Sequence, residues 1–297
     1  MVNSQTSTDK KLIQAAKKVI DMRYSADGQT IIYLTSSDGG GELFALDQSN
    51  SSKKMAQDLN IRGTVGYGGG EFDVSQNFYA VCDKSGNIFT IESKDSHSIK
   101  QTTFKNHQIS SPKISPDEDW IIFIYEKDEI GRIGIPHLHG ENESKQLISG
   151  SDFYMHPTWH PNGEIAAWVE WDHPYMPWDA SKIKIGNFSK KLGEITSFSI
   201  IDGQLDGSAN QPLFSPDGKW LSYIKRNGNW DDLILFDIQT QKKKVVVKGE
   251  GFNLRMPDWL QGFHSYQWSK DSESIFFIKY HQGTSSLGKV NISTCEV

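Results

Sequence analysis

Histidines, cysteines and neighbouring carboxylates are the side chains of this 297-residue chain that could take part in chemistry. Among the nine histidines, His137 and His139 would point to one side of a strand, and His156 and His160 flank a Pro-Thr-Trp segment. A zinc site needs three or four ligands at regular spacing, and neither pair has a cysteine or a third ligand nearby. We therefore predict no metal site and no cofactor.

Motifs for nucleophilic catalysis and for phosphate binding are also absent from the sequence. The glycine-rich stretch 66–70 has neither the Gly-Lys-Ser/Thr ending nor the following helix of a phosphate loop. Asp231 and Asp232 are expected in a turn before a strand, and glycosidase chemistry needs two carboxylates placed on either side of a bond. No Gly-x-Ser-x-Gly sequence occurs, and no strand–helix alternation would hold one. The sequence predicts no catalytic residue in this chain.

A repeated turn accounts for most of the chain. In each copy an apolar residue is followed by Ser or His, then often by Pro, by Asp or Asn, and by Gly. The copies lie at 24–28, 74–77, 114–117, 159–163, 214–218 and 268–271. Pro presets the backbone of a type I turn and Gly adopts the left-handed conformation at its end, so this composition favours a tight hairpin.

Short β-branched and aromatic strands follow these turns, as at 30–34 and 120–125, and a further strand ends each copy, as at 42–47. Four-stranded units repeated at 40 to 55 residues are typical of a β-propeller, whose blades bury their faces against one another. We predict an all-β fold, a propeller of four-stranded blades. Six copies are visible, and the last ends too close to Val297 for a full outer strand. A six-bladed ring and a truncated seven-bladed ring both fit.

The repeat forms one structural unit over 21–297, preceded by an N-terminal segment 1–20 that could form a short helix around 9–20. The net charge of −6 and the lack of a basic stripe argue against nucleic-acid binding. No apolar run approaches the ~18 residues of a membrane span, and no secretory signal is visible. Cys82 and Cys295 do not make a disulfide framework. We expect a soluble, cytoplasmic protein without membrane contact.

The irregular loops map to one face of the propeller. In a four-stranded antiparallel blade the A–B and C–D connections share one face, and the B–C and D–A connections share the other. The repeated turns are A–B connections, whereas 62–70, 151–157, 206–211 and 256–264 enter A strands and 171–179 joins B to C. Aromatic, Gly and polar residues gathered in such loops are typical of a docking or binding face, although single aromatics and glycines also serve packing between blades. The residues assigned to this docking and cavity face are Arg62, Tyr67, Gly68, Gly69, Gly70, Trp171, Asp172, His173, Met176, Trp178, Asp179 and Trp259.

The same loops resemble those of the prolyl oligopeptidase family of serine peptidases, in particular its acylaminoacyl-peptidase-like and dipeptidyl-peptidase-like members. Tyr67 followed by three glycines is similar to a Glu-Tyr-Gly-Gly-Gly sequence of that group, although Gly66 stands where the Glu is expected. Segment 167–179 is close to the group's Trp-Asp-His-Pro-x-Met-Pro-Trp-Asp sequence, and 211–218 and 259–266 resemble its later blades. Ser-Pro-Asp-Gly turns are common in TolB-like propellers more widely.

The resemblance implies a TolB-like propeller whose partner is an α/β-hydrolase domain with a Ser, Asp and His triad. In the family the propeller covers the active-site mouth and admits short peptides. This chain would then be the non-catalytic part, which gates peptide access and docks through 67–70 and 171–179 against a hydrolase domain that lies outside it. Isolated, it should expose an apolar patch at 171–178. The alternative is a stand-alone propeller that binds a peptide or protein partner.

Overall fold

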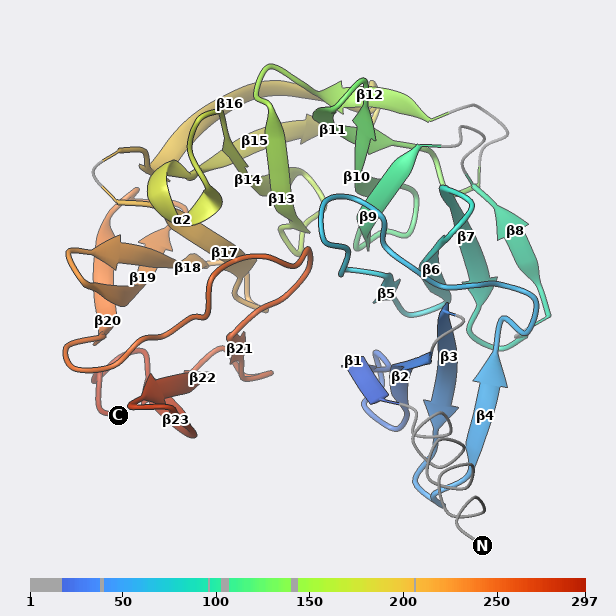
Figure 1. Cartoon of the computed structure of the whole chain (residues 1–297), viewed down its shortest axis with the longest axis horizontal. Coiled ribbons are helices and arrows are strands. Elements are labelled where there is room, and N and C mark those ends of the chain that lie inside the picture. The colour runs from blue at the N-terminus through green and yellow to red at the C-terminus, as the bar shows by residue number, and fades with distance from the viewer. Residues whose placement is uncertain (1–17, 38–39, 96, 103–106, 140–143, 206) are drawn as a thin grey trace, which may run out of the picture.

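Six antiparallel sheets are arranged around a central axis in a computed structural model, which describes residues 18–37, 40–95, 97–102, 107–139, 144–205 and 207–297 (Figure 1). Within each sheet the strands follow one another in chain order, from the inner strand to the outer. The architecture confirms the predicted all-β propeller.

The first three blades have four strands each. Blade 1 comprises β1 (Lys18–Tyr24), β2 (Ile31–Ser37), β3 (Gly40–Leu46) and β4 (Ser52–Met55). Blade 2 comprises β5 (Phe72–Val74), β6 (Phe78–Asp83), β7 (Asn87–Glu92) and β8 (Ile99–Gln101). Blade 3 comprises β9 (Gln108–Ile114), β10 (Ile121–Lys127), β11 (Ile130–Ile135) and β12 (Lys145–Ile148).

Blades 4 and 5 also have four strands, and blade 6 has three. Blade 4 comprises β13 (Phe153–Trp159), β14 (Ile165–Trp171), β15 (Lys182–Ser189) and β16 (Glu194–Gly203), with the one-turn helix α2 (Pro177–Ala180) between β14 and β15. Blade 5 comprises β17 (Ala209–Phe214), β18 (Trp220–Asn227), β19 (Trp230–Asp237) and β20 (Lys243–Lys248). Blade 6 comprises β21 (Tyr266–Trp268), β22 (Ser274–His281) and β23 (Thr284–Asn291).

The repeated turns join the first and second strands of the blades, as expected. In blade 5 the Ser215 hydroxyl donates to Asp217 at 2.7 Å and accepts the Trp220 backbone N–H at 3.0 Å, which closes the turn from inside. Gly218 ends the turn with φ of +75°, a conformation that favours glycine. The residues of the turn therefore form the hydrogen bonds that their types and order predict.

Five apolar clusters hold the ring together, one between each pair of successive blades from 1–2 to 5–6. Among the described residues no sixth cluster joins blade 6 to blade 1, and Met22 of β1 and Leu287 of β23 are exposed there. Within the described residues blade 6 has three strands, as expected from the short last repeat. The blades described number six.

The N-terminal segment differs in part from its prediction. Residues 1–17 of the segment expected to hold a short helix lie outside the described residues, but residues 18–20 begin β1 rather than end a helix. In the described part of the chain α2 is the sole helix, and at four residues it is far too short to cross a membrane.

Candidate functional site

Three aromatic side chains from three blades meet on the face predicted for docking. Tyr67 lies in the loop entering blade 2, Trp178 in α2 of blade 4, and Trp259 in the loop entering blade 6. The ring centroids of Tyr67 and Trp259 are 5.2 Å apart and edge-on, and those of Trp178 and Trp259 are 4.6 Å apart. Tyr67 is 74% exposed and Trp259 is also exposed. We call these three residues the aromatic triad.

The glycines after Tyr67 allow two loops to cross near the axis. Gly69 forms a parallel bridge with Gln261, and the Gln261 N–H donates to the Gly68 carbonyl at 2.9 Å. Figure 1 shows the long loop between β20 and β21 reaching across toward β13 and the loop before β5. A Cβ on Gly69 would lie 2.4 Å from the Gln261 carbonyl oxygen, at a φ of +94°. Glycine is thus required at this crossing.

A substitution of Gly69 tests this requirement. We expect Gly69→Ala to lower the free energy of unfolding by about 2–3 kcal/mol, because it adds both a steric clash and a strained backbone. Gly66→Ala is the control: Gly66 also has a positive φ, but a Cβ there would meet nothing within 4 Å, so only about 1 kcal/mol should be lost. Urea unfolding measures both. Equal losses would contradict the role of close approach.

Bulged residues of the inner strands anchor the loop that carries Trp259. Ser111, His156 and Gln211 have φ of +53°, +52° and +58° in β9, β13 and β17, where the strand register shifts. The Ser111 hydroxyl donates to Gln261 Oε1 at 3.3 Å, and Gln211 Oε1 accepts the Ser265 N–H at 2.8 Å. Each bulge therefore turns a polar side chain toward the segment entering blade 6.

The bulged residue His156 belongs to a buried histidine pair. The rings of His156 and His264 are 5.0 Å apart, and three of their four ring nitrogens have no hydrogen-bond partner. Burial, together with the charges of Lys113 and Arg255, lowers the pKa of His156 to about 3. Burial also holds the pKa of His264 well below its usual range. Both imidazoles are therefore neutral at neutral pH.

A buried ion cluster fixes the base of the same loop. The Arg255 guanidinium, 4% exposed, donates to Asp231 at 3.1 Å, to Asp258 at 2.5 Å and to the Ser208 hydroxyl at 2.7 Å. Burial opposes the charge of Arg255, but Asp258 and Asp231 more than offset it and raise the guanidinium pKa. Gln211 Nε2 donates to the other oxygen of Asp258 at 3.0 Å. One guanidinium thus holds two carboxylates, and the cluster ties blade 5 to the Trp259 loop.

Trp178 is held by the local structure of α2. The Pro177 carbonyl accepts the buried Asn210 amide at 2.9 Å, which ties the helix to blade 5. The Asp179 carboxylate accepts the Met176 backbone N–H at 3.2 Å and so caps the helix start, while the Met176 side chain is exposed. These contacts leave the Trp178 ring free to pack on Trp259.

Among the other residues assigned to the face, Trp171 departs from the prediction. Trp171 is buried and stacks on Phe153 with 5.2 Å between centroids, so it is part of the core between blades 4 and 5 and contributes nothing to an exposed patch. Asp172 and His173 flank Asp152, which accepts the His173 N–H at 2.9 Å. Arg62 is exposed, and its backbone N–H donates to the Cys82 carbonyl at 2.9 Å.

Sequence reasoning missed the residues that position the triad. Asp231 lies inside β19, not in a turn before a strand, and its partner Arg255 has no local motif. The bulged residues did carry a signal: each precedes a proline, as Ser111 precedes Pro112, three residues ahead of the repeated turn. Among the described residues no group of three His, Cys, Asp or Glu is placed to hold a metal ion. The three aromatic rings are the feature that the described residues gather on this face.

Comparison with known proteins shows which proteins share this fold. No family model matches the chain. Dipeptidyl-peptidase 5 of Porphyromonas gingivalis is 26% identical over 148 residues, which are 47% of this chain and 20% of that protein. The structure of a puromycin-hydrolysing peptidase from Mycobacterium tuberculosis superposes with a TM-score of 0.80 at 18% identity, over 95% of this chain and 46% of that chain. The chain has the fold of the propeller part of such peptidases.

That likeness confirms the resemblance to the propeller of prolyl oligopeptidase-family peptidases. Two further proteins are also similar. Protein Atu1656 of Agrobacterium fabrum, an uncharacterised protein, is 27% identical over 155 residues, 50% of each chain. TolB of Acinetobacter baumannii superposes with a TM-score of 0.54 at 17% identity, over 76% of this chain and 53% of that chain. The aligned part of this chain spans half or less of the two curated relatives and of the peptidase structure.

Proposed function

We propose that this chain is the non-catalytic propeller part of a serine peptidase and docks against an α/β-hydrolase domain through the aromatic triad. The observation that carries the proposal is the meeting of Tyr67, Trp178 and Trp259, which come from three blades. Tyr67 and Trp259 are exposed, and Trp178 is partly buried. Exposed aromatic clusters with rigid support are typical of the centres of protein interfaces.

The comparisons support a peptidase context over a stand-alone module. The superposition on the puromycin-hydrolysing peptidase covers 95% of this chain at a TM-score of 0.80, whereas TolB reaches 0.54 over 76%. The part of the peptidase chain beyond the superposed 46% leaves room for a catalytic domain. We propose that the corresponding partner here supplies the nucleophile and the oxyanion donors that this chain lacks.

The crossing loops support a role in access as well as docking. The bridge between Gly69 and Gln261 and the hydrogen bond from Gln261 Nε2 to the Tyr154 carbonyl, at 2.9 Å, join segments of blades 2, 4 and 6. Joined loops on this face would restrict the approach of folded proteins while short peptides still pass around them. We propose short peptides as the substrates that the assembled enzyme would admit.

Two tyrosines provide a matched test of the docking surface. Tyr67→Ala should weaken binding to the α/β-hydrolase domain encoded with this chain, produced as a separate polypeptide, by about tenfold in calorimetry, because Tyr67 contributes buried aromatic area to the interface. Tyr24→Ala should leave binding unchanged, because Tyr24, equally exposed at 68%, ends β1 at the opposite face.

Trp178→Ala extends the test, since it removes the ring on which Trp259 packs, and should weaken binding more than Tyr67→Ala does. Circular dichroism and urea unfolding of each variant report whether the propeller itself is intact. Unchanged binding of both triad variants to the hydrolase domain would contradict the proposal that the triad is the docking surface. An equal loss of affinity with Tyr24→Ala would also contradict it.

A further inference from the structure

The outer strand of blade 4 differs from the outer strands of the other four-stranded blades. β4, β8, β12 and β20 are three to six residues long, and each carries at least one lysine. Short length and lysine are the usual means by which an edge strand avoids pairing with another chain. β16 has ten residues, with neither lysine nor proline. β16 therefore lacks both short length and lysine as protection, and the stretch Ser197–Ile200 between its two register shifts is regular.

The side chains of β16 are also unusually apolar for an outer edge. Phe198 is 61% exposed and Ile200 is exposed beside it on the same face of the strand. The Lys184 ammonium lies 4.4 Å from the centre of the Phe198 ring and covers only part of it. On the other face Ser197 and Ser199 point toward blade 5. An exposed apolar edge of this length is a template for strand addition.

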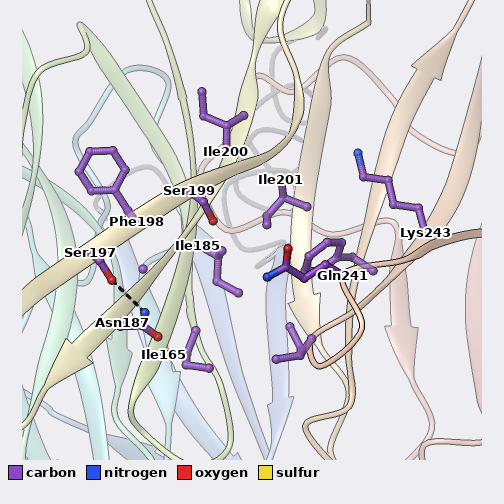
Figure 2. Close-up of a pocket in the computed structure, with 13 residues that line it drawn as sticks. Ile165, Ile185, Asn187, Ser197, Phe198, Ser199, Ile200, Ile201, Gln241 and Lys243 are labelled. Carbon is purple, nitrogen blue, oxygen red and sulfur yellow. Dashed lines mark hydrogen bonds between the residues drawn. The ribbon is translucent and has the colours of Figure 1, made fainter.

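A groove runs alongside this edge. The groove lies between β16 and blade 5 and has a volume of about 440 Å³. Figure 2 shows Ile165, Ile185 and Ile201 along it, with Lys243 on the blade 5 side. In the described structure the backbone groups on the outer side of β16 have no strand partner. An added strand would therefore gain backbone hydrogen bonds from β16 and could place alternate side chains at the groove.

We propose that β16 pairs with β16 of a second copy of this chain, antiparallel and about a two-fold axis through Ser199. In this register Phe198 lies opposite Ile200 of the second copy, and Ile200 opposite its Phe198. Two aromatic–β-branched pairs then form on one face, the kind of cross-strand pair that stabilises sheets. The two outer strands become the centre of an eight-stranded sheet, and the surface is isologous, as in most dimers.

The charges that would face each other favour pairing with a second copy in this register over two neighbouring registers. Glu194 falls opposite the neutral Gln204, and Asp202 is already compensated by Lys225 at 2.6 Å and Lys243 at 2.8 Å. An axis through Phe198 would place Glu194 directly opposite Asp202, which like charges disfavour. An axis through Ser197 would put Ile200 opposite Glu194. Of these three registers, the one with its axis through Ser199 has neither a like-charge pair nor an isoleucine opposite a carboxylate. The aromatic triad is not part of β16, so the pairing of β16 does not depend on the proposed docking function.

Oligomeric state and cross-linking test the proposal. Sedimentation of the purified full chain should show a dimer, and Phe198→Lys should weaken it at least about tenfold, because it places a charge at the pairing edge. Leu287→Lys is the matched control, because Leu287 is 75% exposed on β23, the other long edge. It should leave the dimer intact.

In a Cys295→Ser background, Ser199→Cys should form a disulfide-linked dimer under mild oxidation, since the two copies of residue 199 face each other. Ser197→Cys, which faces Ile201 of the second copy, should cross-link much more slowly. A monomer at every concentration would overturn the proposal, as would dissociation by Leu287→Lys instead of Phe198→Lys. Equal cross-linking at 197 and 199 would also overturn it.

Discussion

Replacing Arg255 with leucine should lower the free energy of unfolding by about 3–5 kcal/mol. The guanidinium is 4% exposed and bonds Asp231 and Asp258, so its removal leaves two carboxylates in a site with little water. The loss arises mainly from these uncompensated buried charges and less from missing Coulomb attraction. Urea unfolding at pH 7 measures it.

The control for this prediction is an arginine that bonds only backbone. Arg132 donates to the Lys127 and Ile130 carbonyls at an exposed hairpin. Arg132→Leu should cost no more than about 0.5 kcal/mol. The Arg255 variant should also disorder the Trp259 loop, seen as increased amide exchange at 256–264. A loss of less than about 1 kcal/mol at Arg255 would mean that the cluster does not hold this loop.

The second large effect is a loss of stability below pH 6.5 caused by the buried histidines. In the unfolded chain both imidazoles have a pKa near 6.5. In the folded chain the pKa is about 3 for His156 and well below its ordinary value for His264. Stability therefore falls as the pH falls through this window, and the slope for His156 approaches about 1.4 kcal/mol per pH unit once the unfolded imidazole is protonated. Between pH 6.5 and 5 this amounts to about 1.6 kcal/mol for His156, and His264 adds a loss in the same direction.

A double variant isolates the contribution of the histidines. His156→Asn with His264→Asn keeps polar side chains, and Asn tolerates the left-handed backbone of residue 156. The variant should lose much less stability between pH 7 and pH 5 than the parent does. Burial raises the pKa of Glu71, which has the opposite effect on the slope, but Glu71 is present in both proteins and cancels. Equal slopes for the two proteins would contradict the assignment.

The fold could be predicted from the sequence because its local signals repeat. A turn such as 214–218 combines a capping Ser, Pro and a left-handed Gly, and its strands read as β-branched and aromatic runs in every copy. The short last blade was also visible as missing length before Val297. The lack of an apolar cluster between blades 1 and 6, among the residues that the structure describes, was not predictable, since it depends on which sheet faces pack together in space.

The candidate site was predictable in position but not in its contacts. Loop connectivity placed Tyr67, Trp178 and Trp259 on one face, and the structure brings their rings together. Trp171 belongs to the same sequence segment as Trp178, yet as the last residue of β14 it turns into the core. Arg255 lies 24 positions from Asp231 and three from Asp258, and no periodic pattern in the sequence connects the three.

The most direct test of the peptidase proposal is fluorophosphonate labelling of the native protein, isolated intact from its own cells through this chain. The proposal predicts a labelled serine in a Gly-x-Ser-x-Gly sequence of an α/β-hydrolase domain, present in the same polypeptide or in one bound to it. Where the domain is a separate polypeptide, Tyr67→Ala and Trp178→Ala together should release it. An intact native protein that carries no such domain and takes up no label would contradict the account and identify the chain as a stand-alone propeller.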